Sequence, residues 1–454
     1  MIAAGRIVRL QPREESFHVA VDAYRSGRLD VCLSGLHSRD DAAAVTLRGR
    51  ALLRLGQAPA AVSELSALDR GALPAHLRGE LGIVLGAALT LVGKAAEARA
   101  VLDETRVWAY SSGAEMTAEF EYYDMFWHWA SGDLAAARAA ALRGLEVGAD
   151  GTRTEDYVSS LPAIRARHLE ALGGFEAAHE RYPEQAAFLR QAIDELDAAS
   201  VADVWVTGSV LSNLAMLVRE LDLGDDDELV MSRYAKIPRT AYTMPFSFHI
   251  FHSLAWCKAL RGDHLGAFRD LREASGAAFA PALQLCATAD RALLADRLGQ
   301  RLTARDELER AQDLAARIDW ENVAGDYRTA LLPFAQALAP FRPRAARTTL
   351  ERYQQIRAKL SPLLLANVDR RLRADELFTE GTVAKAEDNE GGAVRAFLDA
   401  FEIWDEIGFR WRAALAAIEL SLLTRDSRYT GYAAAEAAKR PASWLAERLR
   451  AAGA

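Results

Sequence analysis

Two histidines, His249 and His252, are spaced for metal chemistry in the segment 245–252. Residues three apart on a helix share one face, and two imidazoles on one face can chelate a transition metal. No cysteine or acidic residue lies beside them in the sequence to complete a ligand set. Helix packing, or the lining of a binding groove, explains the pair equally well, and we predict neither a metal nor a cofactor.

Two other segments match chemical motifs only in part. The segment 93–95 ends like a phosphate-cradling loop, but Ala88 stands at the first glycine position and Ala95 at the position of the magnesium-binding hydroxyl. The segment 179–180 opens like a zinc-protease helix, but Pro183 stands where the second histidine is needed. We therefore predict that the protein is not an enzyme and keep catalysis on a helical array as a third hypothesis.

Aromatic side chains gather in two segments, 120–129 and 246–256. In the first, two sets recur at helical spacing on adjacent faces: Phe120, Tyr123 and Trp127, and Tyr122, Phe126 and Trp129. Such a helix is either sandwiched between neighbours or presents one face to a ligand. Aromatic rings tend to dominate partner contacts, and our candidate partner-binding residues are Tyr123, Trp127, Phe248 and His252.

A local excess of basic residues runs from 342 to 373. Nine arginines and lysines stand there against only Glu351 and Asp369. This stretch could attract a phosphate or an acidic peptide, or it could be an ordinary solvated helix face. The sequence leaves both interpretations open.

A repeated pattern indicates the elements that position these residues. A turn residue is followed by a small side chain at plus five and, in most copies, by an apolar one at plus nine. The copies begin at Gly27 (a weaker match), Gly56, Gly93, Gly132, Gly173, Gly262 and Gly299, and without glycine at Phe341 and Asp388. The glycine allows a left-handed turn between two helices, and the small residue allows them to cross closely.

This arrangement resembles the tetratricopeptide repeat (TPR) from about Ser16 to about Leu423. Successive turn residues, with Gly224 among them, are 29 to 51 residues apart and on average more widely spaced than the about 34 residues of the standard repeat. Residues 400–417 and 443–445 resemble the helical-repeat region of large LuxR-type bacterial regulators. That family implies a helix-turn-helix and a nucleotide-binding domain, which we do not find in this sequence, so transcriptional activation is not carried over. The resemblance implies an all-α, TPR-like α-solenoid of about ten irregular helix pairs, a superhelix.

One region breaks the pattern. After Gly224 the expected small residue is Leu229, and Pro238 and Pro245 interrupt the segment beyond it. We expect a single array over 1–454 with a break near 221–247, which would divide it into halves of 1–220 and 248–454.

Composition limits the function classes. Net charge is −8, which argues against direct nucleic-acid binding. The cysteines Cys32, Cys257 and Cys286 are far apart and form no disulfide framework. The longest stretch without Asp, Glu, Lys or Arg, 240–257, has 18 residues and contains two histidines and a proline, and it falls short of the about 20 predominantly apolar residues that cross a membrane. With no signal peptide in evidence, we expect a cytoplasmic protein that does not contact membranes.

The leading prediction is therefore an interaction module for a protein or peptide partner. Stacked helix pairs form extended concave surfaces, and the groove would hold a segment of the partner. Such a module would act as a scaffold or regulator in bacterial signalling or transcription control. The alternative is a sensor of the same architecture that binds a small molecule inside the superhelix.

Overall fold

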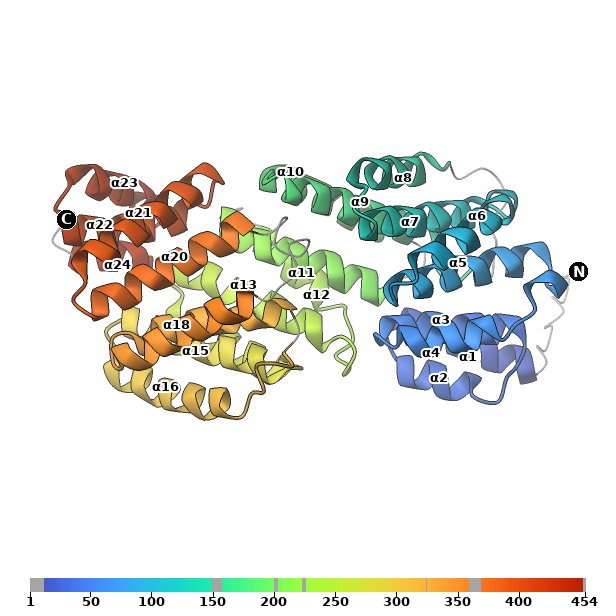
Figure 1. Cartoon of the computed structure of the whole chain (residues 1–454), viewed down its shortest axis with the longest axis horizontal. Coiled ribbons are helices and arrows are strands. Elements are labelled where there is room, and N and C mark those ends of the chain that lie inside the picture. Colours follow the sequence, from blue (N-terminus) through green and yellow to red (C-terminus); the bar gives the residue numbers. More distant parts are fainter. Residues whose placement is uncertain are drawn as a thin grey trace, which may run out of the picture. The chain divides into compact units, whose positions relative to one another are not determined.

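The computed structural model describes residues 12–148, 157–199, 203–222, 226–323, 325–358 and 369–451. In these ranges the chain forms α-helices, two short 3₁₀ helices and turns, with no β-strand (Figure 1). The described helices make up eleven consecutive pairs and one final helix. The fold is therefore the predicted all-α array of TPR-like helix pairs. Among the described residues, no helix has the length and apolar character that a bilayer crossing requires.

The first helices of the pairs are α1 (Pro12–Arg25), α3 (Ala42–Arg54), α5 (Ala75–Leu91), α7 (Ala114–Ala130), α9 (Leu161–Ala178), α11 (Val204–Leu221), α13 (Met244–Leu260), α15 (Pro281–Arg297), α17 (Leu331–Leu338), α20 (Asp369–Ala386) and α22 (Arg410–Thr424). The second helices are α2 (Leu29–Leu36), α4 (Ala58–Ser66), α6 (Ala95–Ser111), α8 (Leu134–Glu146), α10 (Tyr182–Ala198), α12 (Asp226–Tyr234), α14 (His264–Ala277), α16 (Arg301–Ala316), α18 (Pro343–Arg357), α21 (Glu390–Glu406) and α23 (Ser427–Ala438). Helix α24 (Trp444–Ala451) comes last, and the 3₁₀ helices are η1 (Arg70–Ala72) and η2 (Gly325–Ala330).

The chain forms two compact units. Unit 1 consists of residues 1–175, 184–210 and 235–243, and unit 2 of residues 176–183, 211–234 and 244–454. The segment 235–243 thus belongs to unit 1 although both of its neighbours along the chain belong to unit 2. The expected division into halves near 221–247 stays a prediction, and the two units are described separately below.

The repeated pattern marks real turns and close helix crossings. Gly56 and Gly262, for example, have φ angles of 71° and 86°, which only glycine adopts easily. The plus-five residues of eight copies are all 0% exposed, as tight crossing requires: Cys32, Ala61, Ala98, Ala137, Ala267, Ala304, Ala346 and Ala393. At Asp388, where the pattern lacks glycine, φ is 57°.

One predicted turn is wrong. Gly173 lies inside α9, which continues to Ala178. The left-handed residue is Glu180, with φ of 60°, and α10 begins at Tyr182. The chain turns here because the backbone N–H of Arg181 reaches back to the carbonyl of Glu176 over 2.9 Å, a bond that closes the end of a helix. The sequence pattern was therefore displaced by seven residues at this copy.

The first helix of several pairs has a small residue seven positions before the turn. A Cβ atom at Gly86 would lie 2.7 Å from the side chain of Leu102, and one at Gly381 would lie 2.7 Å from Phe397. The residues that it would meet are the plus-nine residues of the same copies. A glycine on one helix therefore receives the large side chain of the other, which explains how each pair packs closely.

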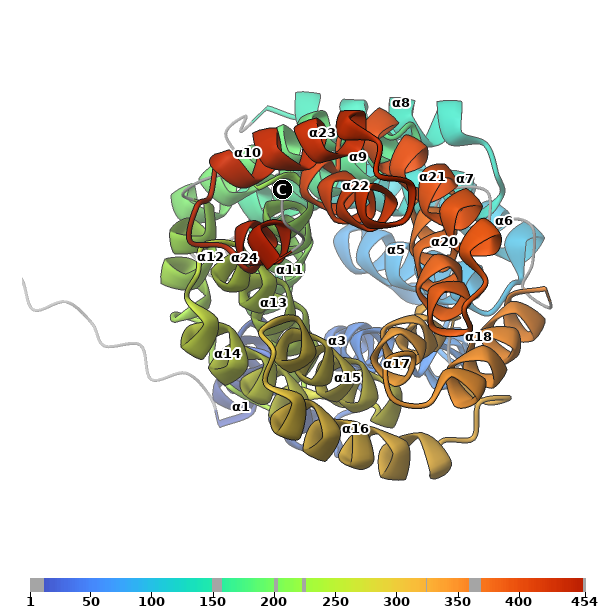
Figure 2. The ribbon, with the colours of Figure 1, turned by 90° about the vertical axis from the view of Figure 1, so that its left-hand side faces the viewer.

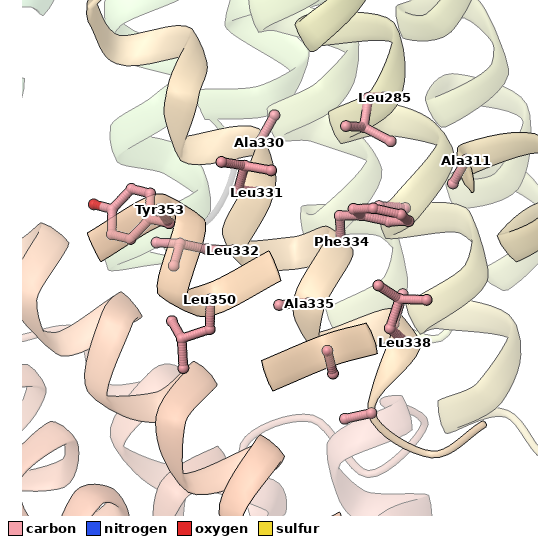
Figure 3. Packing of buried hydrophobic residues seen from close by; sticks show 14 of the residues in the cluster. Leu285, Ala311, Ala330, Leu331, Leu332, Phe334, Ala335, Leu338, Leu350 and Tyr353 are labelled. Carbon is pink, nitrogen blue, oxygen red and sulfur yellow. The ribbon is translucent and has the colours of Figure 1, made fainter. Parts of the chain in front are cut away.

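Unit 2 is built with its first helices on the inside. Figure 2 shows α13, α15, α17, α20 and α22 around an opening, with α14, α16, α18, α21 and α23 on the outside. Neighbouring pairs share apolar contacts. In the cluster between α15, α16, α17 and α18, for example, Leu285, Phe334 and Leu350 are 5% exposed or less (Figure 3).

The last helices of unit 2 return to its first helices. The Trp411 indole N–H donates to the carbonyl of Arg219 over 2.8 Å, and Arg412 donates to Glu220 over 2.8 Å. The turn at Gly262 lies so close to Ala442 that a Cβ there would be 2.5 Å from the Ala442 carbonyl oxygen. Contacts about 190 residues apart in the sequence therefore close the inner helices of unit 2 into a ring.

Candidate functional site

A cavity of about 620 Å³ lies among the inner helices of unit 2. This volume is within the usual range of small-ligand sites, roughly 300–1,000 Å³. A second cavity of about 270 Å³ shares Arg297, Phe378 and Leu415 with the first. The larger cavity has aromatic walls, formed by Phe248, Trp256, Tyr327, Phe378, Trp404 and Trp411.

Helical spacing explains how two helices line this cavity. On α15 the lining residues Leu283, Cys286, Asp290, Leu293 and Arg297 succeed one another at intervals of three or four. Such residues form one stripe along a helix, so the whole length of α15 faces the cavity. On α13 the lining residues at 248, 252 and 256 are four apart, and those at 249 and 253 lie beside them, so they form a broader stripe on one face.

Two acidic residues of the lining are held by arginines. Glu220 accepts hydrogen bonds from Arg219 over 2.8 Å and from Arg412 over 2.8 Å. Burial alone would raise the pKa of Glu220, but these two guanidinium groups outweigh burial and lower the pKa to about 2. Arg412 also donates to Asp375 over 2.7 Å. Burial still raises the pKa of Asp375 above its usual range.

The third acidic residue, Asp290, is held by α13. The distance between His252 Nε2 and Asp290 Oδ2 is 2.6 Å, and the Trp256 N–H donates to the same oxygen over 3.2 Å. Burial opposes ionisation of Asp290, but the hydrogen bond from His252 outweighs it and lowers the pKa of Asp290. Phe248 stacks on the His252 ring at 5.3 Å with an interplanar angle of 11°, which fixes the imidazole.

Among the residues that the structure describes, His252, Cys286 and Asp290 form a group that could hold a metal ion. One donor atom from each lies within 4.8 Å of the other two, and imidazole, thiolate and carboxylate are ligands that zinc accepts. The sequence analysis found no cysteine or acidic ligand beside His252. That expectation is wrong for the folded chain, because the next inner helix, α15, brings Cys286 and Asp290 next to His252. Burial raises the pKa of the Cys286 thiol, so a metal would have to displace a tightly held proton. A hydrogen-bonded His–Asp pair explains the geometry without a metal.

Two half-buried arginines of the lining have no hydrogen-bond or ion-pair partner among the residues that the structure describes. Arg297 and Arg371 line the cavity, and no hydrogen bond or ion pair to either guanidinium is found there. The indole N–H of Trp404 is buried without an acceptor. Arg297 lies over the rings of Trp256 and Trp444, at 5.2 and 4.7 Å from their centroids. Burial lowers the pKa of Arg297 to about 10.

The predicted partner-binding residues lie in different units. Phe248 and His252 both line the cavity of unit 2. Tyr123 and Trp127 lie in unit 1, partly buried against a hydrophobic core. The Tyr123 hydroxyl accepts a hydrogen bond from Arg167 over 3.3 Å, and the Trp127 N–H donates to the carbonyl of Ala95 over 2.9 Å. Their role in partner binding stays a prediction.

The described basic residues of the stretch 342–373 have different surroundings. Residues 359–368 lie outside the described residues. Arg347 pairs with Glu387 over 2.6 Å, and Arg357 pairs with Glu376. Arg371, by contrast, lines the cavity. Near the start of α18, Arg342, Arg344 and Glu387 border an open surface hollow of about 720 Å³, which has few lining residues.

Sequence reasoning missed the most distinctive cavity residue, Arg297. The available signal was the stripe at 283, 286, 290, 293 and 297, in which polar residues continue an apolar face of a first helix. A charged residue on the buried face of a helix is rare without a partner. That conflict could have identified Arg297 before the structure was known.

Comparison with known proteins adds no family. No protein-family model matches the chain, and a search of curated proteins found no match. Among solved structures, the chain is similar to the crystal structure of the APC/C hetero-tetramer Cut9-Hcn1, with 12% identity and a TM-score of 0.29 over 98% of this chain and 96% of that chain. It is also similar to the crystal structure of the P58(IPK) TPR domain, with 15% identity and a TM-score of 0.27 over 92% of this chain and 100% of that chain. These scores are too low to support any argument, so the assignment to a TPR-like helical array rests on the helix pairs described above.

Proposed function

We propose that this chain is a non-enzymatic binding module and that the ring of inner helices in unit 2 holds its ligand. The observation that carries the proposal is the cavity of about 620 Å³ with aromatic walls and two arginines, Arg297 and Arg371, that have no ion-pair partner among the described residues. A ligand that supplies acceptors to these guanidinium groups would form charge-assisted hydrogen bonds, each of about 1.5–3 kcal/mol.

The cavity favours a small molecule, or the end of a chain, over a long peptide laid in an open groove. The inner helices surround it, and contacts between the first and last helices of unit 2 close the ring. A long partner segment would need both ends free, whereas a compact ligand needs only an entrance. The sensor hypothesis is therefore preferred to the extended-groove scaffold.

The regulatory part of the proposal comes from the resemblance to LuxR-type regulators. We propose that binding occurs in the bacterial cytoplasm, where ligand occupancy would stiffen the ring and change how the array presents its surface to a partner protein. Ligand binding that orders a protein alters the free energy of a second binding event without a large structural change.

A cavity-filling variant tests the proposal. Met216 lines the cavity and is partly exposed to it, so Met216→Trp places an indole in the ligand volume without deleting a core side chain. Met231→Trp is the matched control, because Met231 lies on α12 and does not line the cavity. Each purified protein is incubated with a small-molecule cell extract and washed, and the retained compounds are identified by mass spectrometry.

We expect wild type and Met231→Trp to retain the same compound and Met216→Trp to lose it, while all three melt at similar temperatures. Equal retention by Met216→Trp, or no retention by wild type, would contradict binding in the cavity.

A further inference from the structure

Arg297 lines the cavity in a position from which it could bind a ligand. The inference that it does so rests on the proposed function. Its guanidinium lies over the rings of Trp256 and Trp444. The residue also lines both cavities of unit 2. Arginine stacked on aromatic rings loses little freedom when it binds, because the rings already orient the planar group. Its hydrogen-bond donors are therefore oriented before any ligand arrives.

The acidic residues around Arg297 are engaged elsewhere. Asp290, seven positions earlier on the same face of α15, accepts from His252 and Trp256. Glu419, at the second cavity, pairs with Lys385 over 2.7 Å and accepts from Arg448 over 3.0 Å. Within the described parts of the chain, no carboxylate forms an ion pair with Arg297.

We infer that the cavity binds a ligand with a single carboxylate on a flat apolar body, and that Arg297 binds the carboxylate. The aromatic walls would receive the apolar body, and the guanidinium fork matches the two carboxylate oxygens. The same chemistry is present in a free aromatic acid and in the C-terminal carboxylate of a peptide that ends in an aromatic residue.

Charge balance favours a monoanion over a phosphate dianion. The charged lining residues of the larger cavity are four arginines (Arg219, Arg297, Arg371 and Arg412) against three acids (Glu220, Asp290 and Asp375), an excess of one positive charge with histidine neutral. One carboxylate neutralises that excess. A dianion would leave an uncompensated negative charge among three buried carboxylates, which a low-dielectric site penalises.

The test compares acids with their neutral amides on the full-length chain. The probes are phenylacetate and phenylacetamide, then the peptide Gly-Gly-Phe with a free and with an amidated C-terminus, and inorganic phosphate. Binding is measured by calorimetry on wild type, Arg297→Met, Arg297→Lys and Met216→Trp. Arg305→Met is the matched control, because Arg305 is an exposed arginine of unit 2 that also lies over a ring, at 5.7 Å from the centroid of Phe341, outside the cavity lining.

We expect wild type and Arg305→Met to bind an acid more tightly than its amide by about 10- to 100-fold, the range that a charge-assisted hydrogen bond gives. Arg297→Met should bind the acid and the amide equally, and Arg297→Lys should keep only part of the preference. A stronger response to the free peptide than to phenylacetate identifies a chain terminus as the source, and the reverse identifies a small acid.

A second readout needs no ligand. Arg297 is half-buried and has no described ion-pair partner, so Arg297→Met, which keeps the apolar stem, should melt at or above the melting temperature of the empty wild-type protein. A structural role for Arg297 would lower it instead.

Equal binding of acid and amide by wild type would overturn the carboxylate inference and leave the cavity proposal standing, provided that Met216→Trp blocks both probes. Tighter binding of phosphate than of phenylacetate would also overturn it. Acid binding that Met216→Trp does not affect would overturn the cavity proposal itself. Absence of any binding at about 10 mM, weaker than the millimolar affinity expected of a fragment, counts against the carboxylate inference.

Discussion

Two inner arginines of unit 1 are paired with acids, whereas two of the four arginines that line the cavity of unit 2 are not. In unit 1, Arg50 on α3 donates to both carboxylate oxygens of Glu119 on α7, over 2.6 and 2.7 Å, and its Nε donates to Glu80 over 3.1 Å. Arg54 likewise donates to Asp203 over 2.7 Å. In unit 2, Arg297 and Arg371 line a cavity without such a partner among the described residues.

If unit 2 binds a ligand as proposed, this contrast means that one architecture serves two purposes. First helices of this array bring long side chains to the inside of each unit. Where acids from neighbouring first helices meet the arginines, the interior becomes a cross-linked network that joins distant segments. Where the acids already pair with other residues and aromatic rings line a cavity, some arginines keep hydrogen-bond donors that no described acid accepts from. On the proposed function, the pairing of the inner arginines, more than the fold, distinguishes the structural interior of unit 1 from the binding interior of unit 2.

The largest expected effect is in unit 1. Arg50→Met leaves the buried Glu119 and the half-buried Glu80 without their main partner, and breaking a buried pair on one side costs about 3–5 kcal/mol. We expect a matching loss in the free energy of unfolding, measured with urea. The double variant Arg50→Met/Glu119→Met should recover much of that loss because no charge of the pair remains. A single variant as stable as wild type would show that the network does not hold unit 1 together.

The next effect concerns Tyr123 and Trp127. Because both rings pack partly buried against the core of unit 1, we expect Tyr123→Ala/Trp127→Ala to destabilise the chain by roughly 2–4 kcal/mol, below the range for fully buried rings. Thermal melting measures the loss, and a pull-down of partner proteins is run on the same variant. A variant that melts like wild type and loses a partner would instead establish these rings as binding residues, and unit 1 would no longer count as a purely structural interior.

Acid should weaken unit 2 through Glu220. Its folded pKa of about 2 lies below the usual value, so the stability that it adds is fully present above the unfolded pKa and is lost as pH falls from about 5 towards 2. Glu220→Gln should be less stable than wild type at neutral pH, and the gap should narrow in acid. Urea unfolding at several pH values measures this, and a gap independent of pH would contradict the assigned pairing with Arg219 and Arg412.

The smallest effect is expected for Arg371→Met. No described acceptor is lost and the long apolar stem is kept, so the free energy of unfolding should change by no more than about 0.5 kcal/mol. When Arg50→Met is measured in the same urea experiment, the difference between the two losses in the free energy of unfolding shows how much more unit 1 depends on its inner arginine than unit 2 does. A loss comparable to that of Arg50→Met would mean that Arg371 has a structural role as well.

The sequence predicted the helix pairs well because the pattern reflects local physics. A turn residue, a small residue at plus five and an apolar residue at plus nine constrain two adjacent helices, and the residues at 32, 61, 98, 137, 267, 304, 346 and 393 are all fully buried. The pattern failed at Gly173, where a glycine within a helix looks the same in sequence as a glycine at its end. A small residue seven positions before the turn, such as Gly86 or Gly381, would have made the pattern more specific. Such a residue packs against the plus-nine side chain of the same copy.

The cavity could be predicted only in part. Phe248 and His252 were identified because aromatic residues on a first helix gather in one segment, and both line the cavity. Their partners Asp290 and Cys286 are 38 and 34 residues away from His252, and nothing local in the sequence links them. Trp411 and Arg412 contact Arg219 and Glu220, which are 192 residues away in the sequence. Which first helices meet across the interior depends on how the pairs accumulate curvature, and that is a property of the whole stack.

The closure of unit 2 has a consequence for how it folds. An open stack of repeats melts gradually from its ends, because each pair contacts only its neighbours. In unit 2 the N–H of Trp411 bonds to the carbonyl of Arg219, and Arg440 pairs with Asp222, so contacts near opposite ends of the unit hold each other. Such contacts form late because a long loop must close first. Unit 2 should therefore fold slowly and unfold all at once, with hydrogen-exchange protection at its terminal helices as strong as in its middle.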